Sequence, residues 1–247
     1  MVRRRSFLVN TVSAGFAALA GLGANAAFAK ELRQRLKRVS ISVGKSRKVK
    51  VSGERAWHFI LPPDRREDRT RETSGAGRQR EEMRDTIAHA KGTVAYSIEF
   101  LMPEIADTDG RLEAKFIFFQ IKPDAPRGPN DEYWPYFSIQ VDPDYSMWMD
   151  FEFVAGNQIG RPGRASVRQN QWHRLEVVVK WSGGKDGYAQ VNFDGRKIGE
   201  YRGYTGPDGS PHVNFGLYRS HLDRANQSKL ETLELYVRRY SAVQVAA

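Results

Sequence analysis

The second half of the chain alternates apolar and polar side chains with a period of two residues, and this constrains the fold more than any other feature. Over residues 172–181, Leu175, Val177 and Val179 fall at every second position with polar or charged residues around them. Successive side chains of a β-strand point to opposite faces, so the pattern predicts a strand with one buried face. No helical periodicity fits the same spacing.

Turn residues follow this strand at hairpin spacing. Residues 182–187 are rich in Gly and Ser, the alternation then resumes, and Asp194-Gly195 leads into a further short strand over residues 197–201. Asp-Gly between alternating runs is a strong signal for a tight β-hairpin. Similar short runs, separated by turn residues, extend over residues 95–240. The sequence therefore predicts an all-β sandwich or barrel.

The first 29 residues have the features of an export signal. Arg4-Arg5 precedes an uncharged segment, residues 9–29, which is rich in Ala, Gly, Val and Leu and ends in Ala27-Phe28-Ala29. A basic start, an apolar segment and small residues at the cleavage positions are typical of a signal peptide. The paired arginines favour the twin-arginine route.

These features predict a signal peptide over residues 1–29 and a single domain over residues 30–247. We expect the mature protein to be periplasmic or secreted, with no membrane attachment after cleavage. An uncleaved membrane anchor is the alternative, although Asn10, Ser13 and Asn25 interrupt the apolar segment.

The net charge of the chain restricts the classes of partner that an exported protein can bind. The chain has 39 Lys and Arg residues against 29 Asp and Glu residues, a net charge of +10. We expect an anionic partner, either a uronate-containing polysaccharide or the cell surface, and no nucleic acid. A role of the charge in solubility alone is the other interpretation. The chain has no cysteine, which excludes disulfides, a thiolate nucleophile and Cys-type zinc sites.

Two segments each place polar side chains on one face of a strand. In residues 116–122 the two-residue period brings Gln120 and Lys122 together. In residues 212–219 the apolar side chains at alternate positions face the core, and Gly216 leaves room for a close approach. The residues on the opposite face of this second strand are His212, Asn214 and Tyr218.

A third polar segment lies in a charged stretch, residues 62–92, that reads as a loop with a short strand near residues 78–84. This loop is either a solvated surface or a roof over a substrate groove. The two-residue period puts four side chains of the short strand on one face, namely Arg78, Arg80, Glu82 and Arg84.

The three segments resemble motifs of the polysaccharide lyases with a concanavalin-like jelly-roll fold, especially the heparin lyase I-like and glucuronan lyase-like group. In that group Arg-x-Glu, Gln-x-His and Lys-x-Gly-x-Tyr strands lie side by side on the concave sheet. Arg80 to Glu82 matches the first motif, and Gln120 matches the second with Lys122 in place of His. Tyr218 matches the third with Asn214 in place of Lys. The resemblance implies a jelly-roll β-sandwich over most of the chain after residue 29.

The resemblance also implies β-elimination on a uronate-containing acidic polysaccharide. A lyase removes the proton α to a uronate carboxylate, and donors and cations must stabilise the developing negative charge. Tyr218 is then expected to transfer protons, while Gln120, Arg80 and Lys122 hold the acidic sugar. The expected substrate-binding residues are His212, Asn214, Arg78, Arg219, Tyr136 and Trp134, the last two as stacking surfaces.

Alternatives remain for these residues. Tyr218 can be an ordinary exposed strand residue, Gln120 a buried amide satisfied by backbone, and Arg80 a surface ion-pair partner of Glu82. Because Lys122 replaces the family's His, a non-catalytic carbohydrate-binding module on the same fold is the main alternative function.

A glucanase-like glycoside hydrolase ranks third. Asp150 and Glu152 lie on one face of a strand, as paired carboxylates do in retaining glucanases of this fold, but Trp148 stands where a third acid is expected. No cofactor is expected, and a structural calcium ion near these acids is the alternative. The sequence leaves the identity of the polymer and the oligomeric state open.

Overall fold

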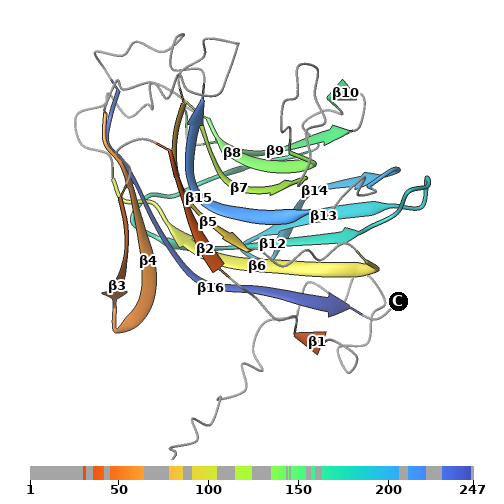
Figure 1. The fold of residues 1–247 in the computed structure, drawn as a ribbon, viewed down its shortest axis with the longest axis horizontal. Helices are drawn as coiled ribbons and strands as arrows, with labels where there is room; N and C mark the ends of the chain where they lie inside the picture. The colour runs from red at the N-terminus through yellow and green to blue at the C-terminus, as the bar shows by residue number, and fades with distance from the viewer. Residues whose placement is uncertain are drawn as a thin grey trace, which may run out of the picture.

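The computed structural model describes residues 30–31, 36–41, 45–63, 78–85, 91–104, 115–123, 135–142, 144, 146–153, 157–158, 163–205, 211–220 and 230–245. These residues form sixteen β-strands and no helix (Figure 1). In chain order the strands are β1 (Lys30–Glu31), β2 (Leu36–Ile41), β3 (Lys45–Val51), β4 (Glu54–Leu61), β5 (Arg78–Asp85), β6 (Thr93–Leu101), β7 (Phe116–Lys122), β8 (Phe137–Val141), β9 (Ser146–Phe153), β10 (Asn157–Gln158), β11 (Arg164–Ser166), β12 (Trp172–Lys180), β13 (Tyr188–Phe193), β14 (Arg196–Arg202), β15 (His212–Ser220) and β16 (Leu233–Val245).

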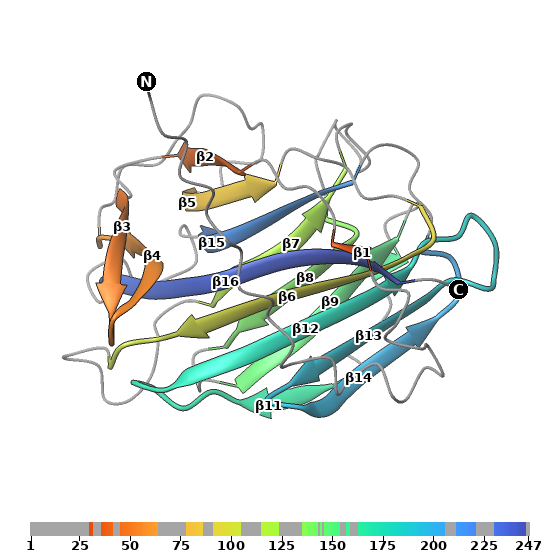
Figure 2. The ribbon, with the colours of Figure 1, turned by 90° about the horizontal axis from the view of Figure 1, so that it is seen from below.

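The strands form two antiparallel sheets that pack face to face (Figure 2). The first sheet has the order β14-β13-β12-β6-β16-β4-β3, with β1 paired to β16. The second has the order β10-β9-β8-β7-β15-β5-β2, with β11 paired to β9. The prediction of an all-β, jelly-roll sandwich is confirmed.

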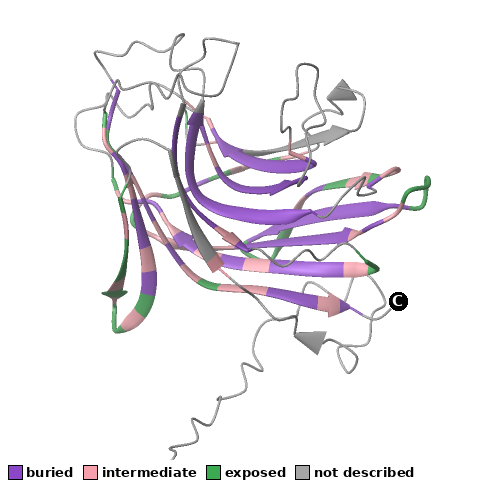
Figure 3. Cartoon of the chain, viewed as in Figure 1, coloured by how far each residue is buried: buried purple, intermediate pink, exposed green. Residues whose placement is uncertain are grey.

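The core lies between the two sheets and is rich in aromatic side chains. Phe100 on β6 meets Phe118 on β7 with ring centroids 4.6 Å apart, and Phe59 on β4 meets Phe215 on β15 at 6.3 Å. Burying each such ring contributes about 1.5–3 kcal/mol, so stability does not require disulfides. Figure 3 shows that the buried residues follow the strands of both sheets.

The predicted hairpins in the second half of the chain are confirmed. Leu175, Val177 and Val179 of β12 are buried in the core cluster. Asp194 and Gly195 adopt φ angles of 48° and 77°, which a tight hairpin between β13 and β14 requires.

A further hairpin, β3–β4, is not among the strands predicted from the sequence. Ser52 and Gly53 turn the chain with φ angles of 49° and 83°. Strand β3 lies at the edge of the first sheet and is rich in Lys and Arg. Charged side chains on an edge strand discourage pairing with other chains. They also replace apolar residues, so the alternation that would have predicted β3 is weak.

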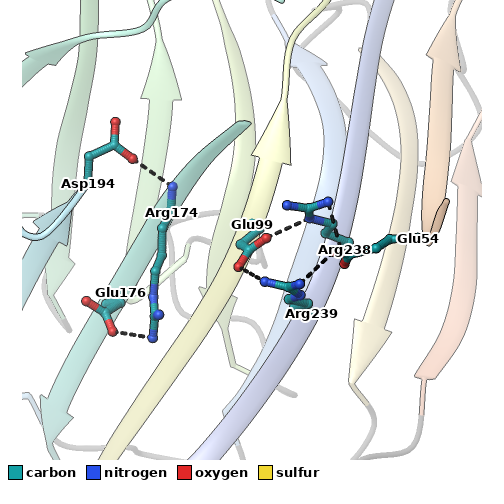
Figure 4. Close-up of polar contacts among 7 residues, drawn as sticks. All are labelled: Glu54, Glu99, Arg174, Glu176, Asp194, Arg238 and Arg239. Carbon is teal, nitrogen blue, oxygen red and sulfur yellow. Dashed lines mark hydrogen bonds and ion pairs between the residues drawn. The ribbon is translucent and has the colours of Figure 1, made fainter. Parts of the chain in front are cut away.

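A β-bulge on β16 organises ion pairs on the outer face of the first sheet (Figure 4). Arg239 has φ of 53°, and the register of β16 with β6 shifts between Arg238 and Ser241. Arg238 and Arg239 consequently both reach Glu99, at 2.6 Å and 2.8 Å. Arg239 also pairs with Glu54 at 2.7 Å.

Among the described residues, no helix is long and apolar enough to cross a membrane. Residues 1–29 lie outside the described residues, so the predicted signal peptide stays a prediction.

Candidate functional site

Polar residues of three strands meet on the face of the second sheet that is opposite the core. Strand β15 lies between β5 and β7. Tyr218 lies opposite Arg80 and Gly216 opposite Glu82 on β5, while Asn214 lies opposite Gln120 on β7. Cross-strand partners share a face of the sheet. The expected side-by-side arrangement of the three motif strands is therefore present.

Glu82 lies at the centre of this face and is fully buried, with 0% exposure. Gln120 Nε2 donates a hydrogen bond to Glu82 Oε1 at 2.6 Å, and Asn214 Nδ2 donates to Oε2 at 3.2 Å. Arg80 Nε forms an ion pair with the same Oε2 at 3.0 Å. Buried carboxylates require such partners, because an uncompensated charge in the interior is very costly. The Glu82 side chain thus fixes residues from all three strands.

Asn214 extends this network to a second cation. Arg84 Nε donates to Asn214 Oδ1 at 3.1 Å, while the Asn214 amide nitrogen donates to Glu82. The Asn214 side chain thus uses its oxygen as an acceptor and its amide nitrogen as a donor, and it bridges a guanidinium and a carboxylate.

Arg80 also covers the ring of Tyr218. The guanidinium carbon lies 4.5 Å from the ring centroid, within the range of a cation–π contact. Arg80, Lys122 and Tyr218 keep exposed fractions of 7%, 8% and 8%. Glu82, Gln120 and Asn214 have 0%, 1% and 0%. The first three thus form an outer layer that can touch a substrate, over an inner layer that holds them in place.

Next to this network, His212 lies opposite Lys122 in the register of β15 with β7. Both side chains are buried, with 6% and 8% exposure. An imidazole and an ammonium group therefore come from neighbouring strands at one end of the polar face.

The comparison with family models gives a match to the polysaccharide lyase family over residues 28–236. The chain belongs to this polysaccharide lyase family. The protein is therefore a lyase, in agreement with the resemblance of its three strand motifs. A comparison with curated proteins gave no match.

Solved structures of low sequence identity share the fold of this lyase. An endo-β-1,4-glucuronan lyase from the fungus Trichoderma reesei matches with a TM-score of 0.64 and 15% identity, over 87% of this chain and 94% of that one. An alginate lyase from Pseudomonas aeruginosa has a TM-score of 0.49 and 15% identity, over 77% and 83% of the two chains. At 15% identity, the likeness to the glucuronan lyase structure supports the jelly-roll fold and does not identify the substrate.

In this lyase, Gly216 allows β15 to lie close to the neighbouring strand β5. Its φ is +138°, and a Cβ atom there would lie 2.5 Å from Glu81 O, 2.8 Å from Glu82 Cα and 3.0 Å from Phe59 Cε1. The space expected at Gly216 is thus occupied by β5 and the core, not open to a ligand. Only glycine lets β15 lie this close to the strand that carries Arg80 and Glu82.

Arg219 does not belong to the polar face, and its expected substrate-binding role is wrong. It shares the two-residue period of the core residues of β15 and has 0% exposure. Its Nη2 donates to the backbone oxygen of Glu231 at 3.0 Å, and burial lowers the pKa of the guanidinium from its usual value. The side chain is structural.

Tyr136 is likewise placed in the interior, so its expected role as a stacking surface is wrong. It belongs to the core cluster, with 5% exposure, and its ring meets Trp181 edge to face at 5.9 Å. Trp181 directly follows β12 of the opposite sheet, so Tyr136 packs between the sheets.

Several predicted residues lie outside what the structure describes. Trp134 is outside the described residues, as are residues 64–77 and 86–90 of the charged segment. Only the backbone positions are described for the remaining ones, which are Arg78, Trp148, Asp150 and Glu152. The predictions for these side chains are not tested.

Glu82 was expected on the polar face, but not at its centre, and β8 was not among the strands expected to form that face. Ser138 lies opposite Gln120, and Gln140 Nε2 donates to Ser138 Oγ at 3.4 Å. The alternation of Phe137-Ser138-Ile139-Gln140-Val141 is the signal that could have revealed this extension of the polar face.

Two of the alternative interpretations are also wrong. Arg80 does pair with Glu82, but in a buried position and not at the surface, and Tyr218 is not an exposed strand residue. Among the described residues, no group of three His, Asp or Glu side chains is arranged to hold a metal ion.

Proposed function

We propose that this lyase cleaves a uronate-containing acidic polysaccharide by β-elimination on the polar face of β5, β15 and β7. The observation that carries the proposal is the buried network in which Glu82 joins Arg80, Gln120 and Asn214, with Tyr218 packed under Arg80. This arrangement holds donors, a cation and a phenol in fixed positions, as the stabilisation of a developing charge requires.

The reaction breaks two bonds of the substrate and forms a double bond. The proton on C5, α to the carboxylate, passes to a base, and the C5 electrons form the C4–C5 double bond. The C4–O bond breaks and its oxygen leaves with a proton from an acid. Negative charge accumulates on the carboxylate between these steps, and neutralising it lowers the barrier.

Residues of both layers supply the groups that this reaction needs. Arg80 and Lys122 of the outer layer place positive charge beside the carboxylate, and Gln120 of the inner layer donates to it the N–H that is not bonded to Glu82. Tyr218 transfers the proton, as acid to the leaving oxygen and as base at C5. All of these groups are side chains, so EDTA is expected to leave the rate unchanged.

Glucuronan is the first substrate to test. The net charge of +10 favours an anionic polymer, and the structure with a TM-score of 0.64 is that of a β-1,4-glucuronan lyase. Alginate and heparin-type polymers complete the panel. Elimination produces an unsaturated uronate that absorbs in the near ultraviolet, whereas hydrolysis produces only new reducing ends.

Tyr218→Phe is the decisive variant. It is expected to abolish the absorbance change while polymer binding persists, because only the hydroxyl is removed. Tyr236→Phe is the matched control, since Tyr236 stacks on His58 in the other sheet and should leave turnover intact. Full activity of Tyr218→Phe would refute the assignment of Tyr218. Binding without any product, across the panel, would favour the carbohydrate-binding module.

We also propose that the protein is exported through the twin-arginine route and released from its signal after Ala29. The support is the sequence of residues 1–29, with Arg4-Arg5 and Ala27-Phe28-Ala29. Replacing Arg4 and Arg5 with Lys is expected to trap the precursor in the cytoplasm. A mature protein that still begins at Met1 would contradict signal cleavage.

A further inference from the structure

A cavity of about 510 Å³ lies at the open edge of the sandwich, away from the candidate site. It is formed by β11, by the segment that leads from it into β12, and by the β13–β14 hairpin. Its lining includes Arg164, Arg168, His173, Phe193, Arg196 and Ile198. Residues of both sheets thus contribute to one hollow.

The charge of this cavity is strongly positive. Arg164, Arg168, Arg196 and Lys197 line it, and Asp194 is its one acidic residue among those described. The Asp194 carboxylate is already engaged, because it accepts from the backbone N–H of the residue after His173 at 2.8 Å and lies 2.7 Å from His173 Nδ1. It is thus poorly placed to neutralise the cations.

Two of the four cations, Arg168 and Arg196, are available to a ligand. The other two form ion pairs, Arg164 with Asp142 at 3.5 Å and Lys197 with Glu200 at 3.0 Å. In the described part of the chain, no hydrogen bond or ion pair engages the guanidinium groups of Arg168 and Arg196. Guanidinium groups bind carboxylates through paired hydrogen bonds.

The base of the cavity is rigid and partly apolar. His173 is buried and packs on Phe193 with ring centroids 4.9 Å apart. His173 Nε2 lies 2.9 Å from the backbone oxygen of Arg168, which fixes the chain that carries this cation. Ile198 adds a further apolar surface. An apolar base with a cationic rim suits a sugar ring that bears a carboxylate.

The cavity lies within reach of the candidate site. Strand β11 pairs with β9, and β8 and β7 follow in the sheet. Three strand spacings separate β11 from β7, which is about 14 Å. Arg164 and Gln140 both lie opposite Trp148 in register, so they occupy the same level of the sheet. A polymer of several sugars can span this distance.

We propose that this cavity is a second binding site, which takes a uronate unit of the same polysaccharide through Arg168 and Arg196. The inference rests on the proposed function for its choice of ligand. The site would hold the polymer at a distance from the reacting bond and so strengthen binding of long chains more than of short ones, since two linked contacts act together.

Binding of β-1,4-polyglucuronate tests the proposal directly. Affinity electrophoresis would use the Tyr218→Phe protein, so that the polymer stays intact, with and without Arg168→Ser and Arg196→Ser. Cellohexaose is the uncharged counterpart of the ligand. The matched control is Lys45→Ser with Lys50→Ser, which removes two exposed cations from β3.

Loss of both arginines is expected to weaken polyglucuronate binding at least about tenfold, since a lost charged hydrogen bond corresponds to about this factor. The β3 control is expected to change it less than about twofold, and Arg168→Lys with Arg196→Lys to restore part of it. Circular dichroism and urea melts of each variant separate a loss of binding from a loss of folding.

The outcomes separate this inference from the proposed function. Polymer binding that depends on Arg168 and Arg196, without any elimination product from the wild type, would support the cavity and refute the lyase assignment to uronate. Equal weakening by the β3 control would reduce the effect to general charge and overturn the cavity. Unchanged binding, or no binding of polyglucuronate by the parent, would also overturn it.

Discussion

Replacing Gly216 by alanine tests whether the close contact of β15 with β5 holds the candidate site together. A Cβ at Gly216 would lie 2.5 Å from Glu81 O and 2.8 Å from Glu82 Cα, both backbone atoms that cannot rotate away. The φ of +138° adds strain of about 1–3 kcal/mol for a residue with a side chain. Overpacking adds about 1–3 kcal/mol more. The sum is a large part of the stability of a typical domain, about 5–15 kcal/mol.

Two other glycines separate these contributions. Gly195 has φ of +77° but no heavy atom within 4 Å of its Cβ position, so Gly195→Ala carries the strain without the collision. Gly183 also has open space and lies in an exposed loop without a positive φ, so Gly183→Ala should be close to neutral. We expect the order of destabilisation to be Gly216→Ala, then Gly195→Ala, then Gly183→Ala.

Urea unfolding followed by tryptophan fluorescence measures these differences. Turnover provides a second measurement, because displacement of β5 moves Arg80 and Glu82 relative to Tyr218. Gly216→Ala should therefore lose elimination activity even at temperatures where it stays folded, and Gly195→Ala should not. A Gly216→Ala protein no less stable than Gly195→Ala, with normal turnover, would refute the inference that this contact positions the site.

Two further predictions concern carboxylates. Glu82→Gln leaves Arg80 without its buried ionic partner, and the new amide N–H group faces the N–H donors of Gln120 or Asn214. Urea unfolding should therefore show that the free energy of unfolding falls by about 3–5 kcal/mol. A loss below about 1 kcal/mol would contradict the central role of Glu82. Hydrogen bonds from Ser182 and Lys180 lower the pKa of Asp186 to about 2, below its unfolded value, so its stabilising effect is present above about pH 4 and is lost as the pH falls through 2. Asp186→Asn should consequently differ from the wild type near neutral pH and converge with it in acid, as measured by urea melts across pH, and a difference independent of pH would count against this assignment.

The sequence could predict those parts of the fold that depend on neighbouring residues. The β12–β13–β14 hairpins follow from two-residue alternation and one Asp-Gly turn, both of which are local. The same period placed Gln120 and Tyr218 on the polar face. Strand β3 was not predicted because it is a lysine-rich edge strand. Such a strand has only one weakly apolar face, and the alternation in its sequence is therefore hard to detect.

Arg219 illustrates the limit of choosing residues by their chemistry. It was selected as a cation for an acidic substrate, although its spacing from Leu217 already placed it on the core side. Arginine is rarely fully buried, and its acceptor, the backbone oxygen of Glu231, lies 12 residues further along the chain, beyond the end of β15. Contacts of this kind, like those of Glu82, depend on strand order and cannot be derived from a local pattern.

The two departures from the family's motifs are related to this strand order. Where the resembling lyases have His on the second motif strand, this chain has Lys122, but His212 lies opposite it on β15. Where they have Lys on the third, this chain has Asn214, and Arg84 of β5 donates to its side chain at 3.1 Å. Directly opposite residues have Cβ atoms only about 5 Å apart, so a neighbouring strand can supply the missing group. The imidazole and the cation are thus retained on the polar face, although each comes from a different strand.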